Sequence, residues 1–129
     1  RANPVMAGFA ATLSNDDMRD VAAYFAAQKP APGSAKNKDT ILIGQRLWRG
    51  GDASKGVAAC AGCHGATGAG VPVQYPRLAG QHADYTEAQL RAFRAKERNN
   101  DPAGMMRTIA SKMTDAEIKA VADYIAGLR

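Results

Sequence analysis

The chain has 129 residues, 46% of them hydrophobic and only 6% aromatic, which allows one globular domain with a short appendage. No apolar run approaches the length of about 18 residues that a membrane-spanning helix needs, so we expect at most peripheral association with a membrane. The net charge is +5, and residues 36–129, with fourteen basic and nine acidic residues, hold the whole excess. The basic residues between 91 and 98 lie among acids and match no nucleic-acid-binding motif, so nucleic acid is excluded as a partner.

The first 38 residues predict a helix followed by a linker. Residues 14–28 place apolar side chains at helical spacing, and Ser14 with Asp17 three residues later is typical of a capping box at a helix start. Two prolines and a glycine between 30 and 34 then break regular structure. We therefore expect an appendage over residues 1–29, a linker over 30–38 and a domain over 39–129.

The domain begins with a predicted helix over residues 40–49, which includes Gly44 and a Trp48 expected in the core. After it comes the C-x-x-C-H pattern of residues 60–64. In a helical turn Cys60, Cys63 and His64 share one face. The two thiols can then add to the vinyl groups of one porphyrin, while the imidazole binds its iron. We predict one covalently attached haem c per chain, with His64 as an axial ligand.

A C-x-x-C pattern is also typical of redox dithiols and zinc sites. A redox dithiol belongs near a β-α-β pattern, which this sequence lacks. A zinc site would need His82 as a fourth ligand and would crowd His64 against both thiolates. We interpret His82 instead as a surface or capping residue at the start of a helix.

The remainder of the domain alternates loops with helices. Residues 65–80 contain four glycines and two prolines and predict a long loop. Helices are expected over 83–98 and 105–112, with an irregular segment over 99–104 between them. The last helix starts at Thr114, which forms a capping box with Glu117, and Met113 before it is expected in the core.

An internal repeat links the two ends of the chain. Residues 6–26 align without a gap with residues 106–126, and caps and apolar positions repeat together. Met6 aligns with Met106, which lies far enough from His64 in sequence to reach the opposite haem face. Met106 is therefore the predicted second axial ligand, with Met105 as its rival. The appendage is too short to bury its own apolar face, so we expect it to pack on the domain, on another copy or on a separate peptide.

The chain resembles class I cytochromes c, and more closely the second half of the two-haem cytochrome c4 family. The residues that carry the resemblance are Gly44, Trp48, the motif at 60–64, and the stretches 75–81, 105–106 and 111–114. This resemblance implies an all-α class I cytochrome c fold over 39–129. It also implies that residues 1–29 are the methionine loop and last helix of a first haem domain, although the chain has no first C-x-x-C-H. It further implies covalent haem at Cys60 and Cys63, axial His64 and Met106, and a hydrogen bond from His64 to the carbonyl of Pro76.

These features predict an electron-transfer protein, not an enzyme, with no catalytic residue of its own. Because thioether-linked haem is attached on the export side in bacteria, we expect a periplasmic one-electron carrier that passes electrons toward a terminal oxidase. A quinol-oxidising complex is the other expected redox partner, and the basic charge favours an acidic docking face. The transfer face is expected near residues 65–73. Two alternatives are an electron-accepting subunit of a flavocytochrome sulfide dehydrogenase and a haem sensor or peroxidase with a dissociable methionine.

Overall fold

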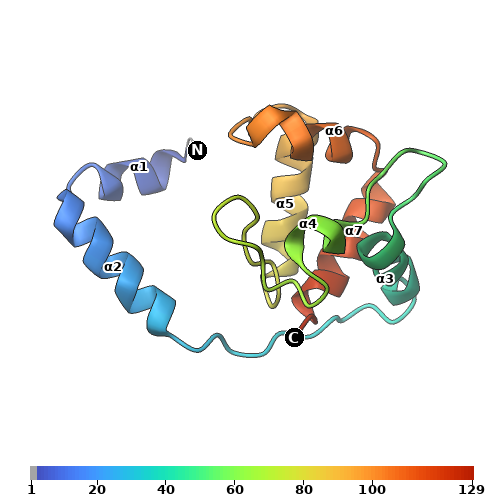
Figure 1. The fold of residues 1–129 in the computed structure, drawn as a ribbon, viewed down its shortest axis with the longest axis horizontal. Helices are drawn as coiled ribbons and strands as arrows, with labels where there is room; N and C mark the ends of the chain where they lie inside the picture. Colours follow the sequence, from blue (N-terminus) through green and yellow to red (C-terminus); the bar gives the residue numbers. More distant parts are fainter. Residues whose placement is uncertain (1–2) are drawn as a thin grey trace. The chain divides into compact units, whose positions relative to one another are not determined.

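The computed structural model describes residues 3–129 and is helical throughout its regular structure, apart from two isolated bridges. The chain forms two compact units, Arg1–Ala31 and Pro32–Arg129 (Figure 1). Among the helices over 3–129, none is both long and apolar enough to cross a membrane. The predicted all-α fold class is confirmed.

The first unit contains one helix that the sequence analysis did not predict. α1 (Pro4–Ala10) occupies the stretch expected as a methionine loop. The side chain of Asn3 accepts a hydrogen bond of 2.9 Å from the Met6 amide, and Pro4 stands at the first helical position. An Asn-Pro pair is a good helix start because asparagine caps a free amide and proline has none to satisfy.

α2 (Asn15–Ala27) follows, and its capping box is confirmed. Ser14 Oγ accepts from the Asp17 amide at 3.1 Å, and Asp17 Oδ2 accepts from the Ser14 amide at 2.9 Å. No residue of α1 or α2 is buried, and Phe9 and Phe25 are 66% and 67% exposed. As expected from the length of this unit, its residues from Asn3 onward form no core of their own.

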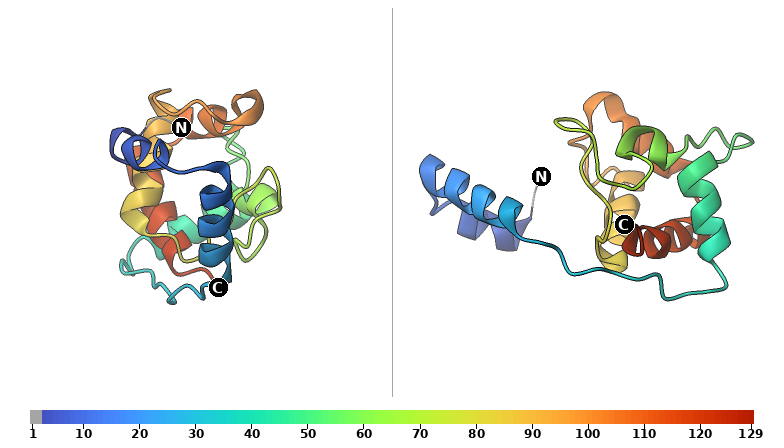
Figure 2. Two further views of the ribbon diagram at one scale, coloured as in Figure 1. Left: turned by 90° about the vertical axis from the view of Figure 1, so that its left-hand side faces the viewer. Right: turned by 60° about the horizontal axis from the view of Figure 1, so that its bottom comes forward.

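The second unit is built around its last helix. α7 (Asp115–Ala126) lies between α3 (Ile41–Gly50) and α5 (Ala83–Arg94) and packs on both (Figures 1 and 2). The one-turn helix α4 (Cys60–His64) packs on α3, and α6 (Met105–Ser111) packs on α5 after the short 3-10 helix η1 (Pro102–Gly104). The core consists of Leu47, Trp48, Val57, Leu90, Met113, Ile118, Val121 and Ile125.

α5 ends earlier than the sequence indicated. The helix stops at Arg94, whereas the spacing predicted a helix to residue 98. Lys96 takes a left-handed conformation with φ of 62°, and the Arg98 amide donates to the Ala92 carbonyl at 3.1 Å. The chain therefore turns back over the last carbonyl groups of α5, and the basic residues after Arg94 are not part of the helix.

Part of the predicted linker lies on the second unit. The Lys36 and Asn37 amides donate to the Asp123 carboxylate of α7 at 2.9 Å and 3.0 Å. A Cβ at Gly33 would lie 2.2 Å from the Ala126 carbonyl oxygen. Residues 33–37 are thus fastened to α7, and the boundary between the units falls at Ala31 and Pro32.

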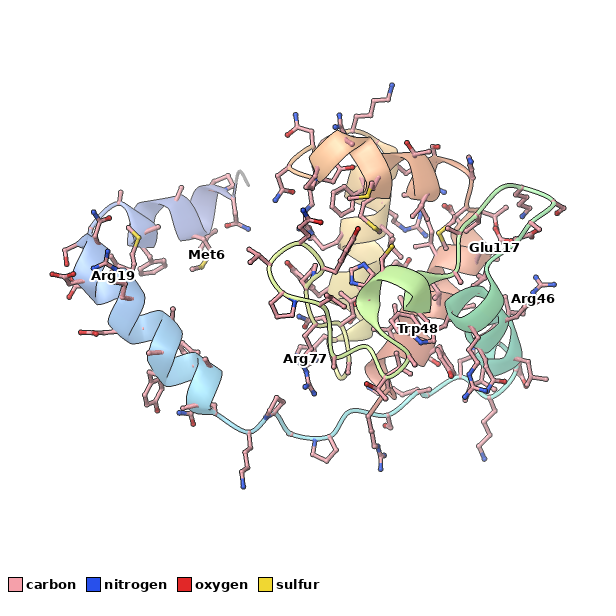
Figure 3. All side chains as sticks on the ribbon, in the orientation of Figure 1. Met6, Arg19, Arg46, Trp48, Arg77 and Glu117 are labelled. Atoms are coloured by element: carbon pink, nitrogen blue, oxygen red, sulfur yellow. The ribbon has the colours of Figure 1, made fainter. Side chains whose placement is uncertain are left out.

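Glu117 ties the start of α7 to the loop after α3. Its carboxylate accepts from Lys55 Nζ at 2.7 Å and from the Thr114 amide at 2.8 Å, and the side chain is only 10% exposed (Figure 3). Thr114 Oγ1 caps the Glu117 amide in return, so this capping box is also confirmed. The Lys55 hydrogen bond, followed by that of the Thr114 amide, lowers the pKa of Glu117 below its ordinary value of 4.5.

This pKa shift predicts how stability depends on pH. A carboxylate with a lowered pKa in the folded state contributes its full stabilisation above pH 4.5 and loses it as the pH falls below that value. Glu117→Gln is expected to lower the unfolding free energy by about 1 to 3 kcal/mol at neutral pH. The difference from wild type should shrink in acid. Denaturant unfolding at neutral pH and at about pH 3, well below the ordinary pKa, measures both values. A difference that stays constant with pH would contradict the assignment.

Candidate functional site

α4 presents the two cysteines and the histidine on one helical turn. Ala59 before it is extended, and Gly65 after it, with φ of 82°, ends it after five residues. Cys60, Cys63 and His64 therefore stand at the first, fourth and fifth positions of the turn, on one side of it. Both cysteines are half-buried and are not joined to each other. Their sulfurs are available for bonds to another group.

The environment of Cys60 argues against a redox dithiol. Its Sγ lies 3.7 Å from the Leu47 carbonyl oxygen of α3. Burial, with a smaller effect of the neighbouring Cys63, raises the pKa of the Cys60 thiol to about 11. Redox-active cysteines have lowered pKa values because the thiolate is the attacking form. A thiol of this kind is instead held in place, protonated, by the α3 backbone.

His64 is buried, and one of its ring nitrogens is engaged. Nδ1 lies 2.9 Å from the carbonyl oxygen of Pro76, and the Tyr75 ring stands edge-on at 6.2 Å between centroids. Since a carbonyl oxygen can only accept, Nδ1 carries the proton. Nε2 is then left with its lone pair, and the hydrogen bond fixes the ring plane, as is usual for a metal-binding histidine.

The loop over 65–80 folds back on itself to bring Pro76 to His64. The His64 carbonyl accepts from the Gly70 amide at 2.9 Å, and the Gly68 carbonyl accepts from the amides of Leu78 and Ala79 at 2.8 Å and 3.0 Å. Gly70 has φ of 82°, and a Cβ there would lie 2.6 Å from the Arg77 amide nitrogen. The loop is thus closely packed on itself.

Trp48 anchors the same loop from α3. Its side chain is fully buried, as the sequence indicated, and lies beside α4 (Figure 3). Nε1 donates to the Ala66 carbonyl at 3.0 Å, a contact that the sequence did not reveal. Buried tryptophans usually find such a partner for the ring N–H. The first helix of the unit therefore positions both ends of the cysteine motif, through Leu47 and through Trp48.

The two candidate methionines begin α6. Both Met105 and Met106 are half-buried. Met106 packs against the core cluster, together with Cys60, Ala61 and Leu78, whereas Met105 is not among the side chains packed there. This difference favours Met106 as the methionine on the inner side of the unit.

The remaining candidates are placed elsewhere. Met6 lies on α1 and is 59% exposed (Figure 3), and both histidines of the sequence belong to the second unit. His82 is exposed at the start of α5. Within residues 3–129, no three His, Cys, Asp or Glu side chains form a group that could hold a metal ion. Two thiols and one imidazole lone pair on a single turn remain, a donor set that suits an iron porphyrin.

Comparison with known proteins agrees with this donor set. The family model described as Cytochrome c matches residues 44–129. Cytochrome c4 of Thiocapsa roseopersicina is 46% identical over 99% of this chain and 67% of its own length. A protein of Thiomonas intermedia (strain K12), named thiosulfate dehydrogenase electron acceptor, is 41% identical over 98% of this chain and 59% of its own length.

A solved structure shares the fold. The crystal structure of reduced recombinant cytochrome c4 from Pseudomonas stutzeri superimposes with a TM-score of 0.94 at 40% identity, over 100% of this chain and 68% of that chain. The chain spans 59 to 67% of the length of three curated relatives that are all named cytochrome c4.

Proposed function

Because the chain belongs to the cytochrome c family and is related to cytochrome c4, we propose that it is a one-electron carrier whose single haem c is attached through Cys60 and Cys63. Proteins of this family carry covalently bound haem c, and residues 60–64 provide the matching C-x-x-C-H motif. His64 and Met106 are the proposed axial ligands. When bound, the haem supplies a one-electron iron couple.

The hydrogen bond between His64 and Pro76 is the observation that carries this proposal. It leaves Nε2 of His64 with its lone pair on the same turn as two unbridged thiols. The thiols hold the group by covalent bonds, the Pro76 carbonyl keeps the imidazole in one orientation, and a thioether on the other side favours ferrous iron. If His64 and Met106 both hold the iron, it would have no free position for a substrate, which would suit electron transfer and not catalysis.

Intact mass and absorption spectra of the matured protein test the proposal. We expect a mass equal to one chain plus one haem, and an oxidised spectrum that contains the iron–sulfur charge-transfer band of methionine ligation. A colourless protein, or one that contains zinc, would contradict the haem assignment. A red protein without the charge-transfer band would contradict methionine ligation alone.

The proposed location is the periplasm, and the proposed electron acceptor is a terminal oxidase. The loop after α4 supports a docking role, because Val71 and Val73 are 50% and 99% exposed. Arg77 at its end points into solvent (Figure 3). An apolar tip with a nearby cation suits weak, short-lived contact with an acidic redox protein.

A second candidate function is to accept electrons from a thiosulfate dehydrogenase. The relative in Thiomonas intermedia that is named thiosulfate dehydrogenase electron acceptor supports this function, since that relative aligns with nearly the whole chain. Catalysis would then belong to the partner, and this chain would only take up the electron. Reduction of the ferric protein by thiosulfate together with such an enzyme, but not by thiosulfate alone, would support this role. Failure of that reduction, with rapid oxidation by a terminal oxidase, would favour the first.

A further inference from the structure

The helix that begins with Met105 and Met106 has no capping side chain of its own. Its N-cap residue is Gly104, in a left-handed conformation with φ of 68°, and no side chain of that residue can accept a hydrogen bond. The first amides of a helix have no partner within the helix and need one from outside. Asp101 provides it, because its Oδ2 accepts from the Arg107 amide at 3.0 Å.

The same carboxylate holds the Arg107 side chain as well. Oδ1 of Asp101 accepts from Arg107 Nε at 2.8 Å. The Asp101 side chain is only 3% exposed, whereas that of Arg107 is 34% exposed. Burial alone would raise the pKa of Asp101, but the hydrogen bonds from Arg107 hold it below its ordinary value of 3.8. Asp101 is therefore a buried, ionised group that binds both backbone and side chain of the residue after Met106.

These two bonds close a turn in an unfavourable conformation. Ala103, with φ of 52° and ψ of 17°, and Gly104 are both left-handed and follow each other directly. A residue with a Cβ rarely adopts this conformation unless its surroundings impose it. Asp101 lies on one side of the turn and Arg107 on the other, so their contact holds it closed. The direction in which the chain enters α6 depends on this contact.

We propose that Asp101 is a positioning residue that, through Arg107, holds Met106 in place as the sixth ligand. This inference rests on the proposed function, because it assumes that Met106 binds iron. The Asp101 carboxylate makes its hydrogen bonds to Arg107 and not to Met105 or Met106. It acts by fixing the backbone that follows Met106, and α6 then keeps that methionine against the core.

Competition by imidazole in the ferric, haem-loaded protein tests this role. A ligand that must displace methionine binds with an apparent affinity proportional to the fraction of molecules in which methionine is released. Asp101→Asn is expected to bind free imidazole about tenfold more tightly than wild type and to lose part of the charge-transfer band. Glu117→Gln is the matched control, because it also removes a buried carboxylate that pairs with a cation and caps a helix. It should lower stability yet change imidazole affinity by less than about twofold.

A second variant covers the case in which Asp101→Asn does not fold. Arg107→Gln removes only the hydrogen bond from the partly exposed side chain and keeps the one from the backbone amide. We therefore expect about threefold tighter imidazole binding. Unchanged affinity in a folded Asp101→Asn or Arg107→Gln protein that retains the wild-type band would overturn the positioning role alone. Wild-type protein with haem but no charge-transfer band would overturn methionine ligation itself, and this inference with it.

Discussion

Replacing Gly44 with alanine is expected to lower the unfolding free energy of the second unit by about 3 kcal/mol, at the upper end for overpacked cores. Gly44 lies in α3 where this helix meets α7. A Cβ there would lie 2.4 Å from the Ala120 carbonyl oxygen and 2.6 Å from Tyr124 Cβ. Neither is the end of a flexible side chain, so the two helices would have to move apart. Denaturant unfolding of the whole haem-loaded chain measures the loss.

The same helix offers a control. Gly50 is the last residue of α3, and a Cβ added there meets no atom within 4 Å. Gly50→Ala should be neutral or stabilise by up to about 1 kcal/mol, because alanine favours the helix. If Gly44→Ala were as stable as Gly50→Ala, this result would contradict the claim that α3 and α7 lie too close at Gly44 for a side chain. A real loss should also weaken the site, since α3 holds Cys60 through Leu47 and the following loop through Trp48.

The helices with local start signals could be predicted from sequence. Ser14 with Asp17 and Thr114 with Glu117 each form the reciprocal hydrogen bonds that their spacing indicated. Such signals are reliable because both partners lie within one turn and need no tertiary structure. α1 has an equally local start signal in Asn3 and Pro4, so this helix too could have been predicted from the sequence.

The contacts that shape the site could not be predicted in this way. The cysteine motif specifies which atoms face one side, but the hydrogen bond from His64 to Pro76 was expected only from the family resemblance. Nothing in the sequence near Asp101 indicated that its carboxylate would cap a helix beginning four residues later. The attachment of Lys36 to Asp123 joins opposite ends of the unit. These contacts depend on how the helices pack, and local preferences carry no information about them.

Replacing Met106 with leucine is expected to change the haem more than any other substitution outside residues 60–64. Leucine has a similar volume and no sulfur, so the stability cost should stay below about 1.5 kcal/mol while the sixth ligand is lost. We expect the charge-transfer band to disappear and carbon monoxide to bind the reduced protein. The midpoint potential should fall by on the order of 0.1 V, a fraction of the roughly 0.8 V range that axial ligands span, because the thioether stabilises ferrous iron.

Met105→Leu is the matched control, since it makes the same chemical change one residue earlier in the same helix. Adjacent residues in a helix point about 100° apart, so only one of the two sulfurs can face the iron. Met106 is the one that packs on the core cluster with Cys60, so Met105→Leu should keep the band, the potential and resistance to carbon monoxide. The opposite result would transfer the ligand role to Met105. If both variants keep the band, the sulfur on iron must come from a different methionine, and the repeat between Met6 and Met106 would then reflect packing alone.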